Sequence, residues 1–79
     1  MMSINDNIHA ERISRLVEGI QEFLAPVPIY MNLIWDYAAL GNAAGVQMAM
    51  HNLTIHVRAA VATSIELAEL RASHNGGNA

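Results

Sequence analysis

The first third of the chain carries apolar residues at the spacing of one face of an α-helix. That side comprises His9, Ile13, Leu16, Val17, Ile20, Phe23 and Leu24. Asn5 or Asp6 can cap the first free N–H groups, and Glu11 and Arg15 stand four apart, as a stabilising ion pair requires. We predict an amphipathic helix that starts near residues 5–6 and keeps its polar side in solvent.

A pair of prolines ends this pattern and opens a second one. In Ala25-Pro26-Val27-Pro28, each proline disfavours helical geometry in the residue before it and removes an N–H donor. Pro28 suits the first turn of a new helix. Residues 29–40 are apolar on nearly every side, with a narrow polar strip of Asn32 and Asp36. A helix that is apolar almost all round is buried, so we predict a buried second helix.

Gly41 and Asn42 predict the next boundary, because glycine often follows the end of a helix and asparagine often caps a new start. From there the helical pattern continues to about Ala72 and shows two opposite apolar stripes. The wide stripe comprises Val46, Met50, Leu53, Val57, Ala60, Val61 and Ala68, and the narrow one Met48, Ile55, Ala59 and Ala62. Between them run two polar strips, one with Gln47, His51, Arg58 and Glu69, the other with Asn52, His56 and Thr63.

The length of this third helix argues against a compact monomer. About thirty helical residues span about 45 Å, whereas a compact chain of 79 residues is about 30 Å across. The two shorter helices fit end to end along one stripe and leave the other uncovered. An uncovered apolar stripe usually marks an interface. We take the narrow stripe of Met48, Ile55, Ala59 and Ala62 as the interface of an oligomer.

These patterns predict an all-α fold in which two shorter helices pack along one long C-terminal helix, assembled as a helical-bundle homodimer or higher oligomer. Strand signals are absent. We expect a flexible N-terminus over residues 1–5, a single helical domain over 6–72 and a disordered Gly/Asn-rich tail over 73–79. The alternative is one continuous helix from Pro28 through Gly41, with the chain bending elsewhere.

The amino-acid composition limits which kinds of partner and which cellular location we expect for this protein. The chain has no cysteine, is 53% hydrophobic and only 14% charged, and carries four arginines and no lysine for a net charge of −3. A nucleic-acid binder normally has a basic excess, so we expect no nucleic acid. The start lacks the basic and apolar segments of a secretory signal, and the most apolar stretch is broken by prolines. We therefore expect a cytoplasmic protein that does not enter a membrane.

The residues that often bind metals do not have a chelating pattern. His51 and His56 are five apart, roughly 140° around a helix, so one ion cannot reach both from the same side. Met48 and Met50 belong to opposite stripes, where packing explains both. His9 is expected at the edge of the core. We predict no metal and no cofactor, although a site between two chains remains open.

Catalytic arrangements are missing as well. No Ser-His-Asp set or carboxylate pair can be recognised, and four arginines are few for binding a dianionic substrate inside a bundle. Gly41 and Gly45 have the small-xxx-small spacing, but no Lys-Ser/Thr follows, as a phosphate loop would require. We interpret this segment as a helix cap with close packing, and we predict that the protein is not an enzyme.

Interaction with another protein is the function that remains. Aromatic residues and arginine dominate binding hot spots, which singles out Tyr30, Trp35, His51 and Arg58 as candidate partner-binding residues. The alternative is that the aromatic residues form the core of the dimer. Size, acidic charge and self-assembly are typical of adaptors, inhibitors and phage or bacterial accessory proteins. We predict a non-catalytic interaction module with an unknown protein partner; the alternative is a small-ligand or cofactor carrier with a cleft in the bundle.

Overall fold

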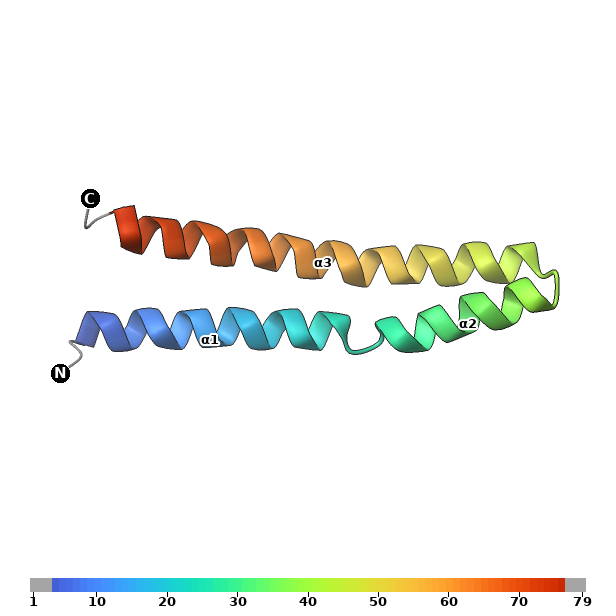
Figure 1. The fold of residues 1–79 in the computed structure, drawn as a ribbon, viewed down its shortest axis with the longest axis horizontal. Helices are drawn as coiled ribbons and strands as arrows, with labels where there is room; N and C mark the ends of the chain where they lie inside the picture. Colours follow the sequence, from blue (N-terminus) through green and yellow to red (C-terminus); the bar gives the residue numbers. More distant parts are fainter. Residues whose placement is uncertain (1–3, 77–79) are drawn as a thin grey trace.

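The computed structural model describes residues 4–76, and the side chains of residues 4–73, as three helices joined by two short turns. They are α1 (Ile4–Leu24), α2 (Val27–Ala39) and α3 (Ala43–Gly76). α1 and α2 follow each other along one line, and α3 returns antiparallel to both (Figure 1). The all-α prediction, with two shorter helices along one long helix, is confirmed, and no strand occurs in residues 4–76.

The helix boundaries lie close to the predicted ones, and the ends extend further. α1 begins at Ile4, and α3 continues to Gly76, four residues beyond the predicted end at Ala72. The expected flexible start and disordered tail therefore overlap helix at residues 4–5 and 73–76. Their remaining parts, residues 1–3 and 77–79, lie outside the described residues.

The proline pair interrupts the line of helices as predicted. α1 stops at Leu24, and α2 starts at Val27 with Pro28 in its first turn. The backbone N–H groups of Ile29 and Tyr30 both donate to the carbonyl of Pro26, at 3.1 and 3.2 Å. Because proline has no N–H, Pro28 in the first turn of α2 adds no donor that would need a partner there.

The turn between α2 and α3 excludes a continuous helix through Gly41. This glycine has φ of +69°, in the left-handed region that favours glycine. The N–H of Asn42 donates to the carbonyl of Tyr37 at 2.9 Å. The side chain of Asn42 then accepts a hydrogen bond from the N–H of Gly45, also at 2.9 Å. The predicted cap is confirmed, and the chain reverses at this point.

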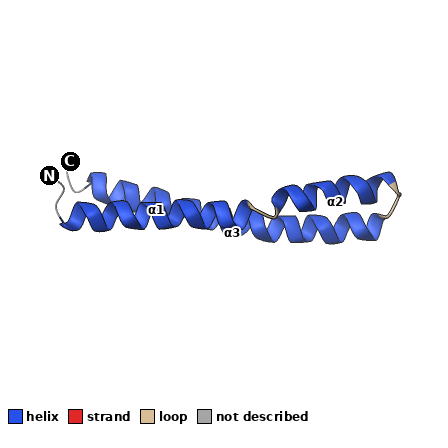
Figure 2. Ribbon diagram, turned by 90° about the horizontal axis from the view of Figure 1, so that it is seen from below, coloured by secondary structure: helices blue, strands red, loops and turns tan. Residues whose placement is uncertain are grey.

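The resulting hairpin is long and flat. It measures 58 × 21 × 12 Å, so its thickness is about that of one helix with its side chains. Its radius of gyration is 18.1 Å, against about 12 Å for a compact chain of this length. Viewed from below, α1 and α2 cross α3 at a shallow angle without adding a second layer (Figure 2). The chain is a single layer of helices.

The side of α3 that α1 and α2 cover differs from the expectation. The wide apolar stripe is covered only in part: Ala60 is buried and Val46 and Leu53 are half-buried, whereas its other members are exposed. The contact also uses the polar strip of Asn52, His56 and Thr63. Among the described side chains, only Ala49 and Ala60 are buried apolar ones, with 1% and 5% exposed. The physical reason is helix spacing: small residues let two helices approach closely along 40 Å or more, which bulky ones would prevent.

Candidate interaction surfaces

The contact between the two arms of the hairpin, which we call the seam, repeats every seven residues. Its central positions are His9, Leu16, Phe23, Tyr30 and Tyr37 on the first arm and Ala49, His56, Thr63 and Leu70 on α3. Such a repeat keeps two helices in contact over many turns. The seam is therefore a coiled-coil contact, built on α3 mainly from small and polar side chains.

Three contacts along the seam show how closely the two arms pack. The ring of Tyr30 stacks on that of His56, with centroids 5.5 Å apart and planes 28° apart. The ring of Tyr37 covers Gly45 so closely that a Cβ on this glycine would lie 2.5 Å from Cδ1 of the ring. Midway along the hairpin, a Cβ on Gly19 would stand 3.8 Å from Cγ2 of Thr63. The space beside a seam glycine is therefore smaller at Gly45, near the turn, than at Gly19.

The polar groups of the seam are accounted for inside it. The hydroxyl of Thr63 donates to the carbonyl of Ala59 at 3.0 Å, which leaves the methyl group of Thr63 facing Gly19. No side-chain nitrogen or oxygen that is buried among the described residues lacks a hydrogen-bond partner. The polar side chains of the seam therefore cost little folding free energy, because a large cost arises only when a buried polar group lacks a hydrogen-bond partner.

The hairpin has two flat sides whose composition follows from helix handedness. In antiparallel right-handed helices, residues one and four positions after a central seam residue lie on the same flat side for both arms. Residues one and four positions before it lie on the other. Each flat side therefore has its own set of residues, and the two sets differ in their number of charged side chains.

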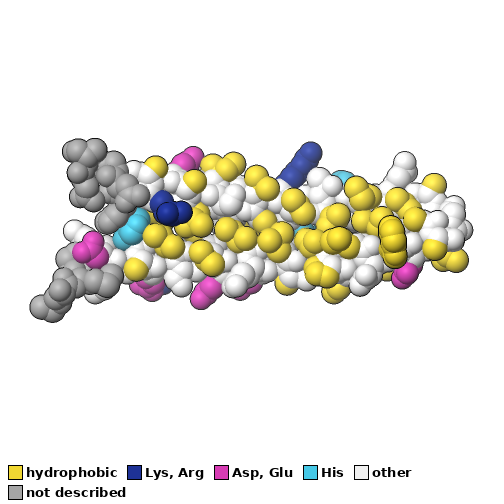
Figure 3. All heavy atoms as spheres, in the orientation of Figure 1, with side chains coloured by type: hydrophobic (Ala, Val, Ile, Leu, Met, Phe, Trp, Pro, Cys, Tyr) yellow, Lys and Arg dark blue, Asp and Glu magenta, His cyan; other side chains and the backbone are white. Residues whose placement is uncertain are grey.

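The first flat side, which we call the uncharged face, holds no ionisable residue between positions 10 and 67. Its members are Ala10, Ile13, Val17, Ile20, Leu24, Val27, Met31, Ile34 and Ala38, with Ala43, Val46, Met50, Leu53, Val57, Ala60, Ser64 and Leu67. Figure 3 looks onto this side and shows apolar side chains over both arms along most of the length, with acidic ones at the lower edge. Ser64 is the polar exception, and its hydroxyl donates to the carbonyl of Val61 at 2.7 Å.

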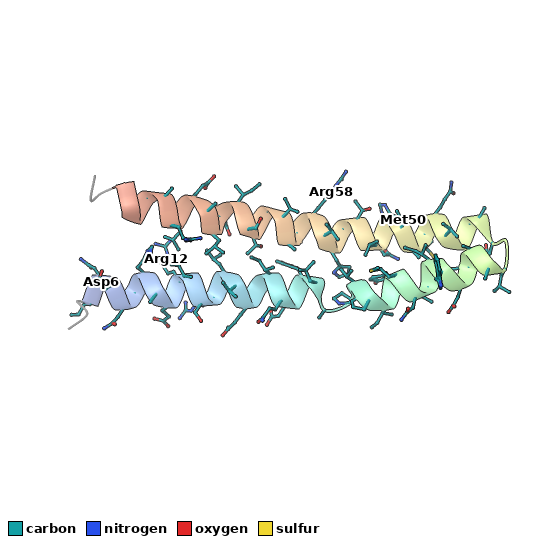
Figure 4. The ribbon with its side chains drawn as sticks, in the orientation of Figure 1. Asp6, Arg12, Met50 and Arg58 are labelled. Atoms are coloured by element: carbon teal, nitrogen blue, oxygen red, sulfur yellow. The ribbon has the colours of Figure 1, made fainter. Side chains whose placement is uncertain are left out.

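The second flat side, which we call the mixed face, has both charged and apolar residues. Its charged members are Arg12, Arg15, Glu22, Asp36, Glu66 and Glu69, and its large apolar members are Ile8, Ile29, Leu33, Met48 and Ile55. Toward the turn it exposes apolar side chains, including Ile29, Met48 and Ile55. Toward the chain ends a hollow of about 540 Å³ is lined by Arg12, Arg15, Leu16, Glu66, Glu69, Leu70 and Ser73. In Figure 4, the labelled Arg12 extends from α1 toward α3. Both signs of charge surround this hollow, so it does not select an anion or a cation.

The residues predicted as an oligomer interface are mostly exposed, but they share a surface with two predicted partner-binding residues. Met48, Ile55 and Ala62 lie on α3 with His51 and Arg58 between them, at steps of three and four residues. We call these five residues the outer stripe. Figure 4 shows Arg58 pointing away from α1 and α2. Ala59 is not part of this stripe, because it is half-buried beside the seam.

The four candidate partner-binding residues do not form one surface. Tyr30 is half-buried in its stack on His56, inside the hairpin. Trp35 has 79% of its surface exposed and stands four residues after Met31, at the rim of the uncharged face. His51 and Arg58 are exposed on the outer stripe. Many residues of the uncharged face were predicted as apolar sides of separate helices. Their alignment into one face without charge across all three helices was not predicted.

The described residues form neither a metal-binding cluster nor a membrane-spanning helix. Within the part of the chain that the structure describes, no three His, Asp or Glu side chains come close enough to hold a metal ion. None of the described helices combines the length and apolar character required to cross a bilayer. His9, expected at the core edge, is half-buried.

Comparison with known proteins adds no relative from which a function can be carried over. No protein-family model, no curated protein and no solved structure matches this chain.

Proposed function

We propose that this protein is a non-catalytic interaction module, an adaptor or an inhibitor, that binds another protein through the outer stripe of α3. The observation that carries the proposal is the exposure of an amphipathic stripe on a rigid helix. Met48 and Ile55 are 56% and 52% exposed, with His51 and Arg58 between and beyond them. Helical recognition commonly uses anchors at steps of three, four and seven residues.

The composition of the outer stripe supports protein binding over a ligand cleft. Methionine and arginine are enriched at the cores of protein interfaces, and arginine is a frequent hot spot. The hollows found among the described residues lie on the surface of a single-layer hairpin, between side chains that are mostly exposed. A small-ligand carrier needs a concave site that surrounds most of the ligand. The adaptor or inhibitor role therefore has the better support.

The test begins with capture of the partner and then measures its affinity. The chain is used as bait in a lysate of its own host, and each protein recovered is purified and titrated by calorimetry. Ile55→Ala and Arg58→Ala are expected to weaken binding about thirtyfold, as hot-spot truncations of about 2 kcal/mol do. Val61→Ala is the matched control, because Val61 is an exposed apolar residue on the same helix that lies off the stripe.

Two outcomes would contradict the proposal. Equal affinities for Arg58→Ala, Ile55→Ala and wild type would exclude the outer stripe as the binding surface. Recovery of no protein, together with a small molecule retained in native mass spectrometry, would favour the ligand carrier instead.

A further inference from the structure

The hairpin lacks the second layer that a stable helical domain requires. Domains are built from at least two packed layers of secondary structure around one core, and this chain provides one layer 12 Å thick. Its accessible surface is 5987 Å², against about 4,700 Å² for a compact folded protein of this mass. The excess is on the order of 1,000 Å² per chain. Apolar side chains of the uncharged face that contribute to it are Val17, Leu24, Met31, Met50 and Val57, each between 37% and 57% exposed.

We propose that the uncharged face is covered by a second copy of this chain, so that two flat hairpins stack into a four-helix bundle. This proposal is independent of the outer stripe, which lies toward the opposite flat side. The area fits: a face of 58 × 21 Å can remove about 1,000 Å² from each chain, or about 2,000 Å² in total, the size at which obligate homodimers begin.

The chemistry of the face points to a copy of itself. A two-fold dimer places the same patch on both partners, so each residue meets a residue of the same face. A patch that contained charges of one sign would oppose itself in such an arrangement. The uncharged face has none between Ala10 and Leu67, and the hydroxyl of Ser64 is already paired within α3. The half-buried Ile13, Ile20, Ile34 and Leu53 between the arms would become fully buried in the bundle, as core positions of helix pairs are.

Two substitutions two residues apart on α3 test which side is covered. Val57 lies on the uncharged face and is 37% exposed, whereas Ile55 lies on the outer stripe and is 52% exposed. Wild type is expected to sediment at twice 8.6 kDa at micromolar concentration. Val57→Glu is expected to weaken dimerisation at least a hundredfold, because each dimer would bury two unpaired carboxylates. Ile55→Glu, the matched control, should leave the dimer intact.

The results below support or overturn the proposed dimer. A folded wild-type monomer of 8.6 kDa overturns it, and so does a dimer that Ile55→Glu dissociates while Val57→Glu does not. If Val57→Glu fails to fold, the thermal midpoint of wild type is measured between 1 and 100 µM as an order-of-magnitude range. A midpoint that rises with concentration supports dimer-coupled folding; a constant midpoint overturns it. Loss of partner binding in Ile55→Glu with the dimer intact would concern the outer stripe alone.

Discussion

The seam and the uncharged face of the same helix, α3, have opposite characters. The seam is covered by α1 and α2, yet it presents Gly45, Ala49, His56 and Thr63. The uncharged face is open in the single chain, yet it presents Val46, Met50, Leu53 and Val57. On this part of α3, large apolar side chains therefore lie mostly outside the seam, and small or polar ones inside it.

Close approach of two helices and burial of apolar surface usually occur at the same contact. In this hairpin they occur on different sides of α3. The seam provides close approach: a ring lies against Gly45, and Ala49 is the most buried residue described. Apolar area is the larger source of stability, at about 25 cal/mol per Å² buried, and this hairpin leaves much of it uncovered. The seam thus sets the shape of the hairpin, and the uncharged face holds the free energy available for a further contact.

The largest effect is expected from enlarging Ala49, a buried residue of the seam. Ala49→Leu inserts three carbons where 1% of the surface is exposed, so overpacking should lower the free energy of unfolding by about 3 kcal/mol. Chemical denaturation followed by circular dichroism measures this change. Ala62→Leu is the control, because Ala62 is exposed on the same helix, and its effect should stay within about 0.5 kcal/mol. Equal effects for the two would mean that the arms are not held closely at Ala49.

A second comparison uses the two glycines that lie within the helices at the seam. A Cβ at Gly45 would lie within 2.9 Å of three ring atoms of Tyr37, whereas one at Gly19 would meet only a methyl group at 3.8 Å. Gly45→Ala should therefore destabilise the hairpin by about 2 kcal/mol, because the ring must move. Gly19→Ala should stabilise it by about 0.5–1 kcal/mol, because alanine favours the helix interior. Thermal melts of both variants, at one fixed concentration, give the two signs, and the same sign for both would contradict the seam geometry.

Much of the fold could be predicted because its signals are local. The proline pair at 26 and 28 ends one helix and starts the next, whatever packs around it. Gly41 and Asn42 likewise reverse the chain through a left-handed residue and a side-chain cap. The end-to-end arrangement followed from helix length alone, because a helix of 34 residues requires the two shorter ones to share its length.

The side of α3 that is covered could not be predicted, because hydrophobicity and close packing favour different sides. The helical wheel places Val57 and Val61 in the wide stripe, yet both are exposed. Met48 and Ile55, in the stripe that was expected to stay uncovered within one chain, are exposed as well. Asn52, His56 and Thr63 form a polar strip on the wheel and lie half-buried in the seam. The rule that apolar stripes are covered holds for a finished assembly, whereas one chain of this length supplies only part of the cover.

The smallest expected change in stability comes from replacing an aromatic residue inside the seam, compared with one outside it. Tyr30 and Trp35 come from the same helix, but Tyr30 is half-buried on His56 while Trp35 is 79% exposed. Tyr30→Leu keeps an apolar side chain of moderate size and removes the stacking, so the loss in stability should be about 1 kcal/mol. Trp35→Leu should change the stability of the hairpin by less than about 0.5 kcal/mol, as exposed substitutions usually do.

Urea denaturation of both variants at one protein concentration measures the difference between these aromatic positions. The single variant His56→Leu and the double variant Tyr30→Leu, His56→Leu complete the test, because the coupling energy from all three variants separates the stacking contribution from the loss of either side chain alone. A coupling energy near zero, with Trp35→Leu as destabilising as Tyr30→Leu, would place the aromatic contribution on the uncharged face. A coupling of about 1 kcal/mol would assign it to the seam, where small residues set the spacing that lets the two rings meet.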